Sequence, residues 1–328
     1  MDWIQIGWVD FNLGLLPAAR NALKGIDPYI ADPGFFSPPW ILYPVFPLTL
    51  IPESLASLIW LGLIVGSALA SLHYAALHFH VVPGRRHLML ILGLLLTPFS
   101  LATFFSGQFT PFVMLGIVGS FMWHRPASTF LLLSLKPQLG ALSAVMLGLR
   151  LARKREWLRL FGSIVAVIAI IGISFLIVPH SLSHFWRGIL AGRSLSQYPE
   201  WTTAIPTALK LLGIGERYIL PLYLLIASMV IASLFLRRDL PMIVVCSLLL
   251  APYAREYDYI LLLIPALYLI RHRYALIPTV LLLFFPLHRF LVGDRSWSWI
   301  STMVPVIFFL ILIFESRKQL KGIRAGQG

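Results

Sequence analysis

The chain has 328 residues, of which 59% are hydrophobic and 12% charged, whereas soluble globular domains have about 45–50% apolar and about 25% charged residues. This composition excludes an ordinary soluble protein, and the single cysteine, Cys246, excludes an internal disulfide or a site built from several cysteines. The net charge of +13 fits the excess of Lys and Arg in the cytoplasmic loops of membrane proteins better than a nucleic-acid partner, and we expect none.

The first 54 residues show neither a membrane span nor a signal peptide, and they are rich in acidic residues and prolines. We predict that residues 1–54 form an extracytoplasmic first loop. Within it, Phe11, Leu15, Leu16, Ala19 and Leu23 share one face at helical spacing. This spacing predicts a short helix that lies along the membrane interface.

Apolar runs then follow one another to the end of the chain. Five of them approach the roughly 20 residues that cross a bilayer, namely 55–79, 88–105, 158–178, 218–236 and 300–314. Four are shorter, namely 109–123, 240–251, 259–270 and 275–286, so these must be tilted, broken or partly buried helices. The pattern predicts an all-α, polytopic transmembrane bundle of about 8–10 segments over residues 55–317, with a basic cytoplasmic tail at 318–328.

Basic residues predict the orientation of the bundle, because cytoplasmic loops are enriched in Lys and Arg. With the basic clusters inside, the extracytoplasmic segments are 1–54, 105–110, 179–217, 252–258 and 287–299. One interval does not fit simple alternation, because three apolar runs separate Arg86 from the cluster at 153–155. Lys136-Pro137 lies inside the run 127–149, where proline breaks a helix and a charge is costly. We therefore predict two half-helices hinged at Lys136-Pro137, both entered from the cytoplasmic side.

Three polar residues near the predicted outer face are candidates for chemistry. Asp10 lies among apolar residues, where a raised proton affinity suits a general base, although Asp is also a favoured helix N-cap. Lys136 suits a phosphate ligand with Gln138 beside it, or it snorkels to water or pairs with a carboxylate. Gln108, after Gly107, suits a sugar hydroxyl or a helix cap.

A short outer turn combines both signs of charge with aromatic rings. Its residues are Tyr253, Arg255, Glu256, Tyr257 and Asp258, and His288-Arg289 repeats the theme more weakly. Such a mixture is suited to gripping a phosphate or a sugar, and local ion pairing at a helix end has the same appearance. The histidines of the run 55–80 are spaced too irregularly to indicate a metal site.

Five stretches of the chain, in this order, resemble the polyprenol-phosphate-mannose-dependent mannosyltransferases of glycosyltransferase family 87, which belong to the class C membrane glycosyltransferases. They are residues 9–29, residues 35–52, GQFTP at 107–111, LSLKPQL at 133–139 and residues 251–265. Two departures, the lack of a span before the first loop and of an aromatic residue at 13–15, leave a truncated or inactive copy as an alternative.

The resemblance implies an inverting transfer of a sugar, usually mannose, from a polyprenyl-phosphate donor to a lipid or glycan acceptor outside a bacterial or archaeal plasma membrane. It makes Asp10 the base, and Lys136 and Arg255 the groups that stabilise the leaving phosphate. It implies neither a metal nor a cofactor, and the only other partners are membrane lipids. Two further functions stay open: a transporter or flippase of lipid-linked sugars, against which the lack of an inverted repeat counts, and a glycan ligase of the same broad class.

Overall fold

The computed structural model describes residues 10–31, 35, 37–81, 84–178, 181–190, 203–284 and 298–325, and these residues form helices and turns without a β-strand. The first loop contains the π-helix η1 (Phe11–Leu15), α2 (Leu16–Leu23), α3 (Pro28–Ala31), and the 3-10 helices η2 (Pro39–Leu42) and η3 (Phe46–Leu50). The bundle follows with α4 (Glu53–His78), α5 (Arg85–Leu95), α6 (Pro98–Ser106), α7 (Thr110–Met122), α8 (Pro126–Ser134), α9 (Pro137–Arg153), α10 (Trp157–Ile177) and α11 (Ser181–Leu190). It is completed by α13 (Ile205–Leu211), α14 (Glu216–Ser233), α15 (Leu240–Leu250), η5 (Glu256–Leu262), α16 (Leu263–Leu269), α17 (Arg273–Phe284) and α19 (Ser298–Ala325).

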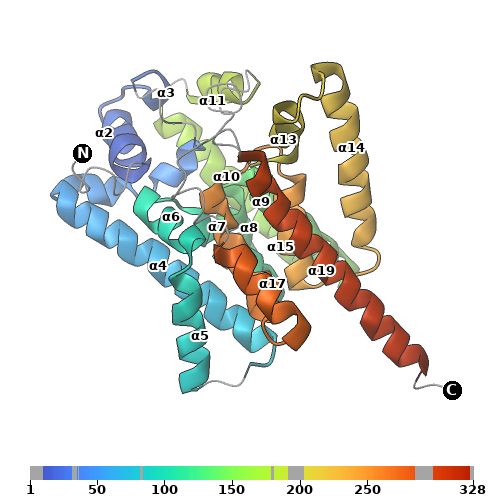
Figure 1. Ribbon diagram of the computed structural model, residues 1–328. Helices are drawn as coiled ribbons and strands as arrows, with labels where there is room; N and C mark the ends of the chain where they lie inside the picture. The colour runs from blue at the N-terminus through green and yellow to red at the C-terminus, as the bar shows by residue number, and fades with distance from the viewer. Residues whose placement is uncertain are drawn as a thin grey trace.

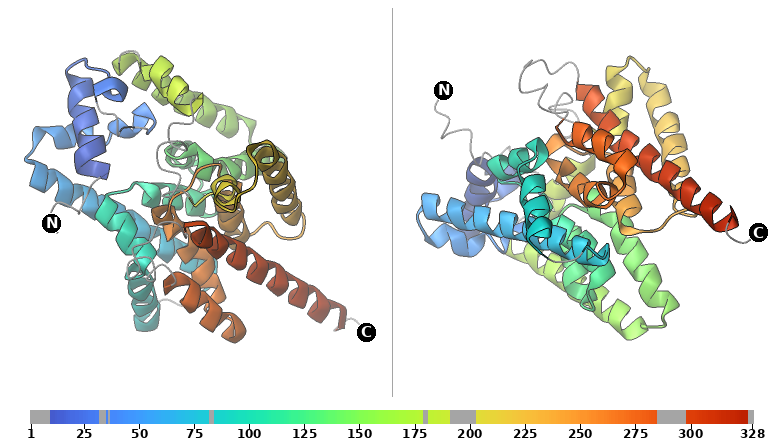
Figure 2. Two further views of the ribbon diagram at one scale, coloured as in Figure 1. Left: turned by 45° about the horizontal axis from the view of Figure 1, so that its top comes forward. Right: turned by 60° about the horizontal axis from the view of Figure 1, so that its bottom comes forward.

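The predicted all-α membrane bundle is confirmed. Three described helices, α4, α10 and α14, are long and apolar enough to cross a membrane, and shorter apolar helices lie within α7, α15, α17 and α19. Only 17% of the apolar window of α10 and 11% of that of α14 is buried, so both present wide apolar faces to their surroundings. In Figure 1, α2, α3 and α11 lie together at the top, and α19 extends beyond its neighbours toward the C-terminus, as Figure 2 also shows.

The predicted span over 88–105 is broken into two helices. This run forms α5 and α6, which meet at an angle of 63°. Pro98 has no N–H to donate to the carbonyl of Leu94, so a regular helix cannot continue through it. The hydroxyl groups of Thr97 and Ser100 donate to that carbonyl instead, at 2.8 and 3.1 Å. The bend is therefore stabilised without an unsatisfied carbonyl in an apolar environment.

Of the shorter apolar runs, those over 109–123, 240–251 and 259–270 form the interior of the bundle, as predicted. The described part of the run 275–286 is partly exposed, with Ile277 at 69% and Leu281 at 66%. Every residue of α15 from Leu240 to Leu249 is buried, and most of α7 is buried as well. A helix that is apolar on all sides is stable only when other helices surround it. These helices, together with η5 and α16, place polar side chains at the centre of the protein.

The predicted break at Lys136-Pro137 is present. Helix α8 ends at Ser134 and α9 begins at Pro137, with Lys136 as its N-terminal cap residue. The two half-helices are in close contact at this point, because a Cβ atom added to Gly140 would lie 2.1 Å from the carbonyl oxygen of Leu133. The hinge therefore holds the backbone of Lys136 in a fixed position.

The predicted helix of the first loop is only partly as expected. Phe11, Leu15, Leu16 and Ala19 are buried, and η1 and α2 pack against α4 and η3. Leu23 is 54% exposed, because it is the last residue of α2 and the chain turns at Lys24. The apolar face is thus covered by protein, and the position of this helix along the membrane interface stays a prediction.

Candidate active site

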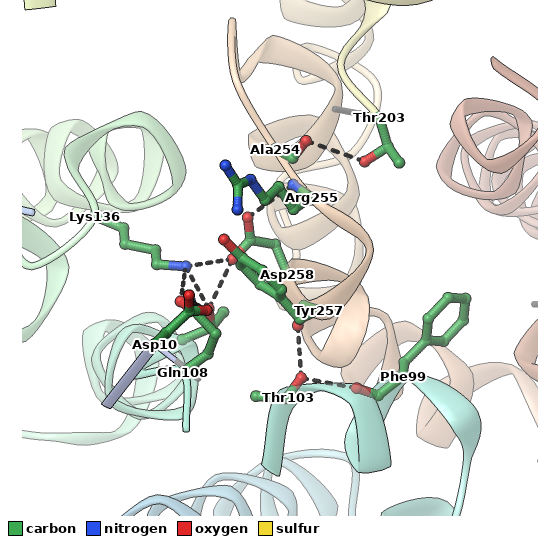
Figure 3. Close-up of polar contacts among 11 residues, drawn as sticks. Asp10, Phe99, Thr103, Gln108, Lys136, Thr203, Ala254, Arg255, Tyr257 and Asp258 are labelled. Carbon is green, nitrogen blue, oxygen red and sulfur yellow. Dashed lines mark hydrogen bonds and ion pairs between the residues drawn. The ribbon is translucent and has the colours of Figure 1, made fainter. Parts of the chain in front are cut away.

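Asp10, Gln108 and Lys136 form a hydrogen-bonded chain at the centre of the protein (Figure 3). The side-chain amide of Gln108 donates through Nε2 to Oδ2 of Asp10, and its Oε1 accepts from Nζ of Lys136 at 3.0 Å. Asp10 lies directly before η1, but its side chain makes no capping hydrogen bond. The N-cap interpretation of Asp10 is therefore wrong, and the first loop contacts the Lys-Pro hinge through Gln108.

Lys136 also forms a buried ion pair with Asp258. Its Nζ atom lies 2.6 Å from Oδ1 of Asp258 and 2.8 Å from the hydroxyl of Thr110, which itself donates to Oδ1 at 2.7 Å. The side chains of Lys136 and Asp258 are only 8% and 1% exposed. An ammonium group has three N–H donors, so Gln108, Thr110 and Asp258 use all three.

The turn before η5 places an arginine beside this ion pair. The backbone N–H of Arg255 donates to Oδ2 of Asp258 at 3.0 Å, and the guanidinium lies over the rings of Tyr253 and Tyr257, 5.5 and 5.9 Å from their centroids. The ring of Tyr257 also lies 4.7 Å from Nζ of Lys136. Nε of Arg255 is buried and has no hydrogen-bond partner among the described residues. Arg255 is thus the cation of this site with an available donor.

The connection between α6 and α7 positions two parts of the site, Gln108 and the 253–258 turn. Gly107 ends α6 with a φ of +69°, and the bonds from Gly107 N to Phe104 O and from Gln108 N to Thr103 O form a Schellman motif. The hydroxyl of Thr103 donates to the carbonyl of Tyr257 at 2.7 Å. This turn therefore holds the backbone of Gln108 and that of the 253–258 turn in register.

Segments predicted to share one side of the membrane are in contact here. The first loop reaches the 105–110 turn through Asp10, and the end of the 179–217 loop reaches the 252–258 turn, where Thr203 N donates to Ala254 O at 2.8 Å. Segments predicted for the other side also contact one another, since Nη1 of Arg150 donates to Ser120 O at 2.6 Å. These contacts bring the segments together, and their assignment to the two sides of a membrane stays a prediction.

Burial changes the protonation of two groups at the site, Asp10 and Tyr253. Burial raises the pKa of the Asp10 carboxyl above its ordinary value of 3.8, and the hydrogen bond from Gln108 opposes that rise. Burial raises the pKa of Tyr253 to about 12, so its phenol stays protonated at neutral pH. No hydrogen bond from the described residues reaches Oδ1 of Asp10, which leaves this oxygen available to accept a proton.

Of four further predicted site residues, two lie apart from this network and two lie outside the described part of the chain. Gln138 is half-buried in the first turn of α9 and makes no hydrogen bond to the described residues. Glu256 accepts a hydrogen bond from Ser301 of α19 at 2.6 Å, which directs it to a different neighbour. His288 and Arg289 lie outside the described residues. The candidate site thus rests on Asp10, Gln108, Lys136 and the 253–258 turn.

Sequence reasoning missed Thr110 and Thr103. Both are ordinary residues in apolar surroundings, and hydroxyl groups in membrane helices usually bond to their own backbone. The signal for Thr110 was its place directly after Gly107-Gln108 and before Pro111, where a helix starts. Among the described residues, no group of three or more His, Cys, Asp or Glu side chains is arranged to hold a metal ion.

The fold and the site define an α-helical membrane protein with a buried acid, amide and cation centre. The sequence model of glycosyltransferase family 87 matches residues 35–265, which include Gln108, Lys136 and the 253–258 turn but not Asp10. The chain therefore belongs to glycosyltransferase family 87 and is a glycosyltransferase. Searches of curated proteins and of solved structures give no match.

Proposed function

We propose that this glycosyltransferase moves a sugar, mannose in the first instance, from a polyprenyl-phosphate donor to a hydroxyl of a lipid or glycan acceptor. The reaction takes place at the extracytoplasmic face of a cell membrane and inverts the anomeric carbon. The observation that carries the proposal is the meeting of Asp10 with Gln108, Lys136 and Arg255 at one buried centre. A donor carried on a membrane lipid suits this site, because the site lies inside a bundle of membrane helices.

In the proposed step, the acceptor oxygen attacks the anomeric carbon of the donor sugar while the bond from that carbon to the phosphate oxygen breaks. Oδ1 of Asp10 takes the proton of the acceptor hydroxyl. The electron pair of the broken bond leaves on the phosphate, whose added negative charge needs a preorganised cation. A single displacement of this kind inverts the configuration at carbon.

Arg255 is the better ligand for the departing phosphate. All three donors of Lys136 are used within the protein, and its charge is balanced by Asp258. The guanidinium of Arg255 is held by the faces of two tyrosine rings, and its buried Nε has no hydrogen-bond partner among the described residues, so this donor is available to a ligand. We therefore assign phosphate binding to Arg255 and give Lys136 the task of positioning Gln108 and Asp258.

The test is transfer of labelled mannose from polyprenyl-phosphate-mannose to a lipid extract by the purified protein in lipid nanodiscs. Asp10→Asn should lower the rate by about 10²–10⁴-fold with unchanged thermal unfolding, because the base is lost and the side-chain shape is kept. Asp27→Asn is the matched control, since Asp27 is a second buried carboxyl of the first loop and bonds to His184 and to the backbone N–H of Tyr29. Full activity of Asp10→Asn, or transfer only from nucleotide sugars, would contradict the proposal.

A further inference from the structure

Trp60 touches both segments that carry the acid and its amide partner. It lies about two turns after the start of α4 and is fully buried. Its ring stacks on that of Phe11 with centroids 5.1 Å apart and planes inclined by 17°, and its Nε1 donates to the carbonyl of Gly107 at 2.8 Å. Phe11 directly follows Asp10, and Gly107 directly precedes Gln108. The rigid side chain of Trp60 therefore contacts the residue next to Asp10 and the residue next to Gln108.

The carbonyl of Gly107 is buried and needs a hydrogen-bond donor from the protein. It follows the last turn of α6 in the left-handed conformation, and the site is too deeply buried to rely on bulk water. A buried carbonyl without a donor is costly, and the indole N–H supplies that donor. The bond consequently fixes the α6 to α7 turn against α4.

The contact with Phe11 is supported by a second one nearby. Ser57 lies one turn before Trp60 on α4 and donates to Oδ1 of Asn12 at 2.8 Å. Side chains three residues apart on a helix lie on the same face, so Ser57 and Trp60 meet consecutive residues of η1. This pair of contacts sets the register of η1 on α4, and with it the position of Asp10.

We infer that Trp60 is a positioning residue that sets the distance between Asp10 and Gln108 by holding Phe11 and Gly107 on one indole ring. The inference rests on the proposed role of Asp10 as the base. The interactions of Trp60 in the described part of the chain lead to Asp10 and Gln108 and not to Arg255, so its effect on the reaction passes through the Asp10–Gln108 pair. Its loss should lower kcat and leave the KM for the donor unchanged, because the base takes part in the transition state and not in donor binding.

The experiment compares Trp60→Phe with Trp40→Phe in the nanodisc transfer assay. Trp60→Phe keeps an aromatic ring and removes the N–H, whereas Trp40 is a second buried tryptophan, 7% exposed, whose Nε1 has no partner among the described residues. We expect a fall in kcat of up to about 10²-fold for Trp60→Phe and none for Trp40→Phe, because small displacements of a catalytic group have effects of this size. The acid limb of the pH profile should also move to higher pH, since Asp10 loses part of its hydrogen bond.

A double-mutant cycle with Gln108→Leu separates positioning from a general loss of stability. If Trp60 acts through the Asp10–Gln108 bond, the double variant should be no slower than Gln108→Leu alone. Additive losses in kcat, or an unchanged pH profile in Trp60→Phe, would overturn the inference. If Trp60→Phe does not fold, Phe11→Leu tests the same contact from the other side with the same expected results. An active Asp10→Asn enzyme would instead refute the proposed function, so the two failures are distinguishable.

Discussion

Arg255 and Arg237 are both largely enclosed by the bundle, yet they are held in different ways. Arg237 donates through Nε to Asp239 at 2.6 Å and through Nη1 to the carbonyl of Leu312 at 3.3 Å, and it also lies over the ring of Tyr268. Arg255 is held mainly by two ring faces and keeps a buried Nε without a partner among the described residues. An arginine whose N–H groups donate to groups of the protein stabilises the structure. An arginine whose guanidinium stacks on aromatic rings keeps an N–H free to bind a ligand.

Lys136 belongs with Arg237 in this comparison, and its loss should have the largest effect. Lys136→Met leaves the carboxylate of Asp258, which is 1% exposed, without its cation. Breaking a buried pair from one side costs about 3–5 kcal/mol, so unfolding of the variant in detergent should occur at much lower denaturant concentration. Lys136→Met with Asp258→Leu should recover most of that stability without recovering transfer. A single variant as stable as the parent protein would place Lys136 with Arg255 instead.

The comparison predicts opposite outcomes for removing the two arginines. Arg255→Gln should lower kcat by about 10²–10³-fold, the usual effect of losing one donor to a developing negative charge, with little change in unfolding. Arg237→Gln should lower the unfolding temperature and leave kcat per folded molecule unchanged. Measuring transfer and thermal unfolding on the same preparations tests both statements. The distinction between the two arginines fails if both variants lose activity in proportion to their folded fraction.

The smallest effect is a shift in the pH dependence of the reaction when Gln108, which lies between Asp10 and Lys136, is replaced. The hydrogen bond from Gln108 favours the charged form of Asp10, so Gln108→Leu should raise a carboxyl pKa that burial already raises. The base works only when deprotonated, so the loss of kcat/KM should grow as the pH falls and become smallest at alkaline pH. Thr97→Val removes a buried hydroxyl at the other end of α6 and should leave the profile in place. An acid limb shifted to lower pH by Gln108→Leu would contradict this account.

The parts of this protein that the sequence predicts are those with a local cause. Proline at 137 directly after a charged residue predicts the break of the 127–149 run, and the short apolar lengths predict the buried helices α7 and α15. The bend at Pro98 has an equally local cause, but the apolar run continues through it, and hydropathy alone treats 88–105 as one span. The sequence also left open whether Lys136 meets a phosphate or a carboxylate.

The site itself depends on contacts that no local pattern contains. Asp10 and Gln108 are 98 residues apart, and Lys136 and Asp258 are 122 apart. Their meeting depends on how η1 docks on α4 and how η5 packs beside α7. Trp60 was read only as part of an apolar run, since its role follows from the two segments that it touches.

Gly140 gives the hinge one more property. There is no room for even one extra carbon atom between α8 and the start of α9. The half-helices beside Lys136 therefore cannot move apart to make space for a larger substrate. We expect a relative adapted to a larger sugar to gain its space on the side of the first loop or of the 253–258 turn. Libraries designed to change which sugar is accepted should vary those two segments and leave the half-helices untouched.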